Sequence, residues 1–79
     1  MTAMDIAVFD FLEMVGHDEL FDIYVNGIQV GAGVEYSEAR WKYFNSELPP
    51  LLDKAMRCNV IKVDFRNRRI FAEDGEKND

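Results

Sequence analysis

The sequence predicts a small α+β domain in which helices and β-hairpins follow one another in the order α-β-β-α-β-β. Three observations lead to this fold class. Asn26-Gly27 stands between two apolar runs and is the strongest short signal for a two-residue type I′ turn. A second pair of alternating segments closes the chain, and a segment with helical spacing of apolar residues precedes each pair. Elements in this order pack as an antiparallel sheet with helices on one face.

The length of the chain limits it to one domain. Seventy-nine residues leave room for a single hydrophobic core, so we expect one domain over residues 1–79, with 74–79 as a frayed tail. No apolar run approaches ~18 residues, the N-terminus lacks the basic region of a signal peptide, and a lone cysteine fits a reducing compartment. We therefore expect a soluble, cytoplasmic protein with no membrane contact.

The first predicted element is a helix over residues 2–15. Thr2 is a favourable N-cap, Asp5 supplies the acid of a shortened capping box, and Gly16 follows the last helical residue. With 100° per residue, one apolar face is formed by Met4, Val8, Phe11, Leu12 and Val15. The short apolar run 6–9 is also compatible with a strand.

Two strands, at 20–25 and 28–34, are expected around Asn26-Gly27. A two-residue loop pairs Val25 with Ile28, Ile23 with Val30 and Phe21 with Ala32, and these six residues form the predicted core face. The opposite face carries Asp22, Tyr24 and Gln29. Gly31 and Gly33 permit a bulge in the returning strand.

Helical signals return at Ser37, a suitable N-cap. Trp41, Phe44 and Leu48 have the spacing of a core-facing stripe. Pro49-Pro50 should interrupt the run, because proline cannot donate a helical hydrogen bond. A second helical piece, capped near Ser46, carries the apolar residues Leu48, Leu51, Leu52, Ala55 and Met56.

The last predicted elements are strands at 60–65 and 69–73, joined around Asn67-Arg68. Alternation places Ile61, Val63 and Phe65 inward, where they pair with Ile70 and Ala72. Lys62 is expected to face Glu73 on the outside.

Charge is divided unequally along the chain. Residues 1–39 contain no lysine or arginine but eight carboxylates: Asp5, Asp10, Glu13, Asp18, Glu19, Asp22, Glu35 and Glu38. The remainder holds nine basic residues and seven acids, 9 − 7 = +2, so the formal charge of −6 is −8 plus 2. Such separation makes one surface electronegative and selects basic partners. Ile6, Phe9 and Tyr24 are predicted beside these acids, and carboxylates around exposed aromatic groups suit a basic surface with apolar patches.

Residue types for catalysis or metal binding are scarce. His17 is the only histidine and Cys58 the only cysteine, so a Cys/His zinc cluster cannot form. Ser37 and Ser46 lack the context of a nucleophile elbow, and residues 18–22 lack the glycine of an EF-hand loop. We predict a protein that is not an enzyme and that has no catalytic residue, metal or cofactor.

The chain resembles the small acidic inhibitors that phages and mobile elements encode, especially anti-CRISPR proteins and other DNA mimics. The resemblance rests on length, acidity, a single α+β domain and a lack of catalytic machinery, without a shared motif. It implies an inhibitor in the host cytoplasm whose carboxylates imitate phosphates, occupy a basic groove of a CRISPR effector complex and block its nucleic-acid channel. Applied to the acidic half of the chain, the resemblance implies that the partner-binding residues are Asp5, Phe9, Asp10, Glu13, Asp18, Glu19, Asp22 and Tyr24.

Two other interpretations remain open. In one, the protein forms a homodimer: its acidic half docks on Arg66, Arg68 and Arg69 of a second copy, or the edge strand 28–34 joins another sheet. In the other, the tip 66–69 contacts RNA or DNA. A net charge of −6 opposes direct nucleic-acid binding, and we favour a solvated turn. An aromatic stacking platform at Trp41, Tyr43 and Phe44 is less favoured, because their helical spacing marks Trp41 and Phe44 as core residues.

Overall fold

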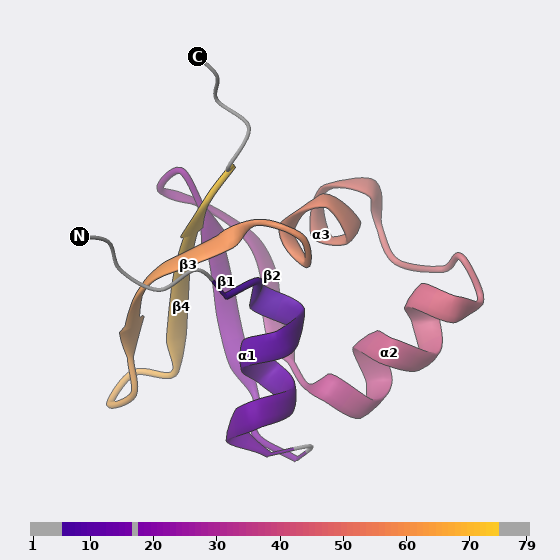
Figure 1. The fold of residues 1–79 in the computed structure, drawn as a ribbon, viewed down its shortest axis with the longest axis horizontal. Coiled ribbons are helices and arrows are strands. Elements are labelled where there is room, and N and C mark those ends of the chain that lie inside the picture. The colour runs from indigo at the N-terminus through magenta and orange to yellow at the C-terminus, as the bar shows by residue number, and fades with distance from the viewer. Residues whose placement is uncertain (1–5, 17, 75–79) are drawn as a thin grey trace.

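Two β-hairpins lie side by side, and helices cover one face of the sheet that they form (Figure 1). The structure is a computed structural model that describes residues 6–16 and 18–74. Its elements are α1 (Val8–Val15), β1 (Phe21–Val25), β2 (Ile28–Val34), α2 (Tyr36–Phe44), α3 (Pro50–Ala55), β3 (Asn59–Asp64) and β4 (Arg69–Glu73). The α+β class is confirmed. The order is α-β-β-α-α-β-β instead of the predicted α-β-β-α-β-β, because the region before the second hairpin forms two separate helices on either side of Pro49.

The sheet is mixed, so the prediction of a purely antiparallel sheet is wrong. Its strand order is β2-β1-β4-β3, with antiparallel pairing within each hairpin and parallel pairing between β1 and β4. Each hairpin fixes only its own antiparallel pairing. The direction of one hairpin relative to the other depends on the long connection through α2 and α3, which carries the chain from one edge of the sheet to the other.

Helix α1 begins at Val8, later than predicted. The two residues before it are held against the start of β3: Val60 N–H donates to the Ile6 carbonyl at 2.9 Å, and Ala7 forms a β-bridge with Asn59. The strand-like alternative for this run is limited to the single bridge at Ala7, since Val8 and Phe9 are helical. The helix buries Val8, Phe11 and Leu12 as predicted and leaves Val15 half-buried. The predicted cap at Thr2 and the acid Asp5 lie outside the described residues.

The turn at Asn26-Gly27 is of the predicted type, but the strand register beyond it is not. Asn26 has φ 53° and Gly27 has φ 83°, as a type I′ turn requires, and Val25 pairs with Ile28. Further along, Ile23 pairs with Gly31 and Phe21 with Val34, so the predicted partners Val30 and Ala32 are wrong. The ladder slips twice, between Tyr24 and Ile23 and again between Ile23 and Phe21. At the second slip Gly33 adopts φ 59° and donates its N–H to Asp22 Oδ1 at 2.9 Å. After these slips Val34 is buried, whereas Ala32 is exposed. Ile28 pairs with Val25 as predicted, but its side chain is exposed, contrary to the predicted core face.

A second irregularity changes the predicted alternation of β3 around Ile61, whereas Val63 packs against the core and pairs with Ile70 as predicted. Val60 pairs with Ala72 and Lys62 with Phe71, with a register shift between the two pairs. Ile61 therefore points outward, although it was predicted to point inward, and Val60 is buried in its place. Lys62 lies opposite Phe71 rather than the predicted Glu73. The Phe65 side chain is exposed, contrary to prediction.

Helix α2 does not bury the predicted stripe. The side chains of Trp41 and Phe44 are 59% and 69% exposed, and Ala39 is the buried residue instead. The nine-residue helix carries aromatic residues on several sides, so periodicity alone does not select its inner face. Helix α3 buries Leu52, and Ala55 and Met56 near its end are also buried, as expected of the second helical piece.

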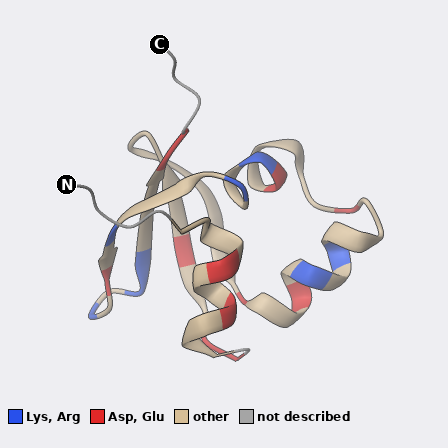
Figure 2. Ribbon diagram, in the orientation of Figure 1, with Lys and Arg blue, Asp and Glu red and all other residues tan. Residues whose placement is uncertain are grey.

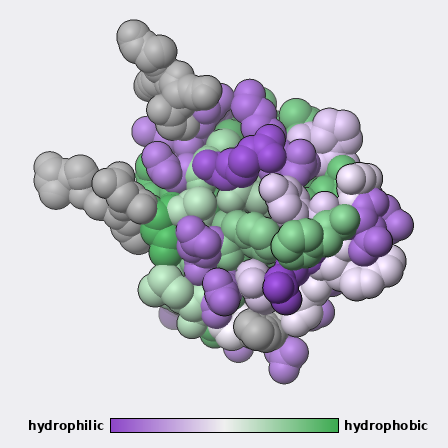
Figure 3. Space-filling model, turned by 45° about the vertical axis from the view of Figure 1, so that its right-hand side comes forward, coloured by the Kyte–Doolittle hydropathy of each residue, from purple (hydrophilic) through white to green (hydrophobic). Residues whose placement is uncertain are grey.

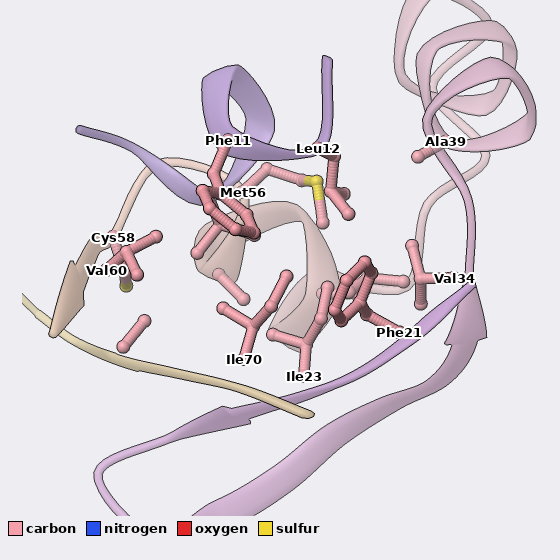
Figure 4. Packing of buried hydrophobic residues seen from close by; sticks show 14 residues of the cluster. Phe11, Leu12, Phe21, Ile23, Val34, Ala39, Met56, Cys58, Val60 and Ile70 are labelled. Atoms are coloured by element: carbon pink, nitrogen blue, oxygen red, sulfur yellow. The ribbon is translucent and has the colours of Figure 1, made fainter. Parts of the chain in front are cut away.

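The core lies between the sheet and helices α1 and α3 (Figure 4). Its largest fully buried side chains are Phe21, Leu12, Ile23, Met56, Ile70, Val8 and Val60. Cys58 is buried beside them and acts as a small apolar residue.

Of the predicted tail 74–79, only Asp74 lies within the described residues, and its carboxylate lies 3.3 Å from Lys54 Nζ. In the part of the chain that the structure describes, no helix is long and apolar enough to cross a membrane.

The left-handed turn leads to a stability prediction. Gly27→Ala is expected to lower the free energy of unfolding by about 1 kcal/mol, because a Cβ disfavours positive φ. Steric contact does not complicate the result, since a Cβ at Gly27 meets no described atom within 4 Å. Urea denaturation measures the loss. Gly27→Asn is the control, because asparagine tolerates this conformation; an equal loss for both variants contradicts the explanation.

Candidate functional site

The described residues of the predicted partner-binding set are distributed over two sides of the molecule. Asp10 and Glu13 project from α1 on the side away from the core. Asp22 and Tyr24 alternate with the buried residues of β1 and therefore point to the opposite face of the sheet. Figure 2 shows the acidic positions on α1 and the one on β1. Asp5 lies outside the described residues.

Three of these acids form what we call the α1 carboxylates: Asp10, Glu13 and Asp18. All three are exposed, and Asp18 lies in the connection just after α1. None forms an ion pair with a lysine or arginine of the described residues. Asp10 and Glu13 are three residues apart on a helix, so their side chains are neighbours and their negative fields add. Met14, beside them in the sequence, is 71% exposed and offers apolar contact area.

Two other acids of the set are used within the fold. The Glu19 carboxylate forms an ion pair with the Arg68 guanidinium, which also lies over the Phe21 ring at 5.7 Å. Asp22 accepts the Gly33 N–H at the bulge of β2. Glu19 thus fastens the connection after α1 to the tip of the second hairpin, and Asp22 fixes the edge strand.

The two aromatic members of the set have different surroundings. The half-buried Phe9 ring lies 5.4 Å from the Tyr36 ring and 5.6 Å from the Tyr43 ring, centroid to centroid, and so joins α1 to α2. The Tyr24 ring stacks on Phe71 at 5.2 Å on the outer face of the sheet. Phe9 therefore stabilises the arrangement of helices, whereas Tyr24 belongs to a surface remote from the α1 carboxylates.

Cations accompany Tyr24 on that outer sheet face. The Arg69 guanidinium lies 5.9 Å from the centre of the Tyr24 ring, and Lys62 Nζ lies 5.6 Å from the centre of the Phe71 ring. Each ring therefore contacts the other ring and one cation of the same chain. This arrangement accounts for the aromatic pair without a ligand.

The arginine-rich tip at 66–69 is a well-formed turn. Asp64 accepts hydrogen bonds from the Asn67 side-chain amide at 2.9 Å and from the Asn67 backbone N–H at 3.2 Å. These bonds, the side-chain bond foremost, hold the pKa of the Asp64 carboxyl below its ordinary range. Because Arg68 pairs with Glu19 and Arg69 lies over Tyr24, the tip has fewer free cations than the sequence suggests.

Comparison of the chain with protein-family models, with curated proteins and with solved structures finds no match. The site is therefore inferred from the geometry of the chain alone.

Within residues 6–16 and 18–74, no three His, Cys, Asp or Glu side chains gather closely enough to hold a metal ion. The sequence pattern already marks the aromatic residues of α2 but assigns Trp41 and Phe44 to the core, and the structure leaves both exposed. The available signal was the spread of Tyr36, Trp41, Tyr43 and Phe44 around the helix, which one buried stripe cannot accommodate.

Proposed function

We propose that the protein is a non-enzymatic inhibitor that uses its α1 carboxylates to bind a basic, nucleic-acid-binding surface of another protein. In the manner of anti-CRISPR proteins, it occupies the channel of a CRISPR effector complex in the cytoplasm and blocks nucleic acid from entering. The observation that carries this proposal is the exposed position of Asp10, Glu13 and Asp18 without cationic partners among the described residues. Carboxylates that are not neutralised within the fold keep their full attraction for lysine and arginine elsewhere.

The mechanism requires no chemical step. A groove built to bind nucleic acid presents lysine and arginine side chains at the spacing of phosphates. The α1 carboxylates place negative charges on a short, rigid helix and its following connection, where they can replace phosphates at part of that groove. Met14 adds apolar contact beside the charges. Inhibition then follows from occupancy, because the bound domain excludes nucleic acid sterically.

The structure narrows the residues on which the proposal depends. Glu19 and Asp22 already have partners within the chain. Phe9 contributes by holding α2 against α1, and Tyr24 lies on the outer face of the sheet. The proposed contact surface therefore consists of Asp10, Glu13 and Asp18 with the adjoining Met14.

The proposal predicts salt-dependent binding in competition with nucleic acid. A purified CRISPR effector complex should bind the protein with an affinity that falls about tenfold between ~50 and ~200 mM salt, because added ions screen exposed charges. The protein should also displace a labelled nucleic-acid substrate from the complex. Biolayer interferometry and fluorescence anisotropy measure the two effects. Binding that leaves the substrate in place, or that is insensitive to salt, contradicts this function.

A further inference from the structure

Helix α2 presents an aromatic surface that the described residues do not cover. Trp41 is 59%, Phe44 69% and Tyr43 36% exposed, and the helix buries only Ala39. In Figure 1 this helix stands at the side of the molecule, beyond α1. Tryptophan, tyrosine and arginine are the residue types that most often dominate the energy of protein interfaces. Their concentration on one exposed helix indicates an interface.

The surface has both projections and hollows. The Tyr43 and Phe44 rings meet edge to face at 5.6 Å, and the Arg40 guanidinium lies 5.4 Å from the centre of the Phe44 ring. Phe44 borders two hollows. One, of about 360 Å³, extends to Tyr36 and Trp41. The other, of about 410 Å³, is lined by Tyr43 and Leu48 and, at its polar side, by the ion-paired Asp53 and Arg57. The view from this side of the molecule shows apolar side chains in a central band with hydrophilic groups around it (Figure 3).

The charge of this region permits two copies to approach each other. Residues 36–57 carry four cations and three acids, Arg40, Lys42, Lys54 and Arg57 against Glu38, Glu47 and Asp53, so the sum is 4 − 3 = +1. Two of the acids are paired locally, Glu38 with Lys42 at 3.1 Å and Asp53 with Arg57 at 3.7 Å. By contrast, contact through the α1 carboxylates would bring like charges together. In a chain of net charge −6, the α2 region is thus a nearly neutral, mixed-charge surface on which self-association meets little repulsion.

We propose that α2 packs against α2 of a second copy around a two-fold axis. In such an interface the same patch serves both copies, so a projecting group must lie beside a hollow that can receive its counterpart. Phe44 and the hollows on its two sides meet this requirement. Each Phe44 ring would enter a hollow of the partner copy, with Trp41 packed at the margin. This interface differs from docking of the acidic half on the arginine tip, and it does not depend on the proposed inhibitory function.

The single tryptophan provides the test. At ~100 μM the full chain should sediment as a dimer, and dilution to ~1 μM should shift the Trp41 emission to longer wavelength as the indole becomes exposed to water. Phe44→Ser should raise the dimer dissociation constant at least about tenfold, with unchanged circular dichroism. Ile61→Ser is the matched control, because Ile61 is 52% exposed on β3 and should leave the dimer intact.

Three results overturn the proposal. The first is a monomer at ~100 μM whose Trp41 emission does not change on dilution. The second is a dimer that Phe44→Ser leaves as stable as before. The third is a dimer that dissociates when Arg66, Arg68 and Arg69 are changed to alanine but not when Phe44 is changed, which would place the contact at the hairpin tip.

Discussion

Leu12→Ala is expected to lower the free energy of unfolding by about 2–5 kcal/mol. The Leu12 side chain is 0% exposed and points from α1 into the core, so its removal leaves a cavity as well as lost apolar contact (Figure 4). A domain of this size gains about 3–5 kcal/mol from its core. The substitution should therefore leave a large fraction of the molecules unfolded at room temperature, which urea titration followed by circular dichroism will detect.

Leu51→Ala is the matched control for this change. Leu51 also lies in a helix, α3, but its side chain is 66% exposed. The same substitution there should change the free energy of unfolding by less than about 0.5 kcal/mol. Similar losses for the two variants would show that α1 does not pack on the sheet as described.

Features set by neighbouring residues were predictable from the sequence. Asn26-Gly27 specifies its turn because both residues accept positive φ. The break before Pro49-Pro50 was also predicted, although α2 already ends at Phe44, where Ser46 adopts φ 57°, and Pro50 begins α3. The buried face of α1 likewise follows from the spacing of Val8, Phe11 and Leu12. Each of these outcomes depends on contacts within a few positions of the chain.

Features set by distant contacts were not predictable in the same way. The β2 register shifts twice, once beside the bond from Gly33 N–H to Asp22, and the β3 register shifts between Val60 and Lys62. Each shift changes which residues are paired beyond it, and the spacing of apolar residues does not encode it. The parallel pairing of β1 with β4 requires two hairpins to meet after a long connection, and no local pattern encodes that meeting.

The candidate site shows the same limit. Sequence grouping treated all acids before Arg40 as one surface, but strand alternation sends Asp22 to the face of the sheet opposite α1. The ion pair between Glu19 and Arg68 joins positions 49 apart, which composition cannot reveal. What remains after these assignments is a smaller group of acids on and just after α1. The inhibitory function is consequently a proposal about Asp10, Glu13 and Asp18.

The double variant Asp10→Lys, Glu13→Lys is expected to weaken binding to the proposed basic partner by about 100-fold or more. Each change removes an attraction and introduces a repulsion against lysine and arginine, and like charges that face each other across an interface cost several kcal/mol. A loss of about 1.4 kcal/mol lowers the affinity tenfold, so two reversals that each cost at least that much lower it about 100-fold or more. Both side chains are exposed on α1, so the fold should survive. Titration of the effector complex at constant salt measures the change.

The variant Glu47→Lys, Glu73→Lys is the control that tests whether the position of the reversed charges matters or only the net charge of the protein. Each double reversal adds four charges, −6 + 4 = −2, so the two variants have the same net charge. Glu47 and Glu73 are also exposed and form no ion pair with the described residues, but they lie outside the α1 carboxylates. If the α1 carboxylates are the contact surface, the affinity of this control should fall only a few-fold, because it loses only the long-range attraction that net charge supplies. Equal weakening by both variants would mean that binding responds to total charge, and the local mechanism would then be wrong.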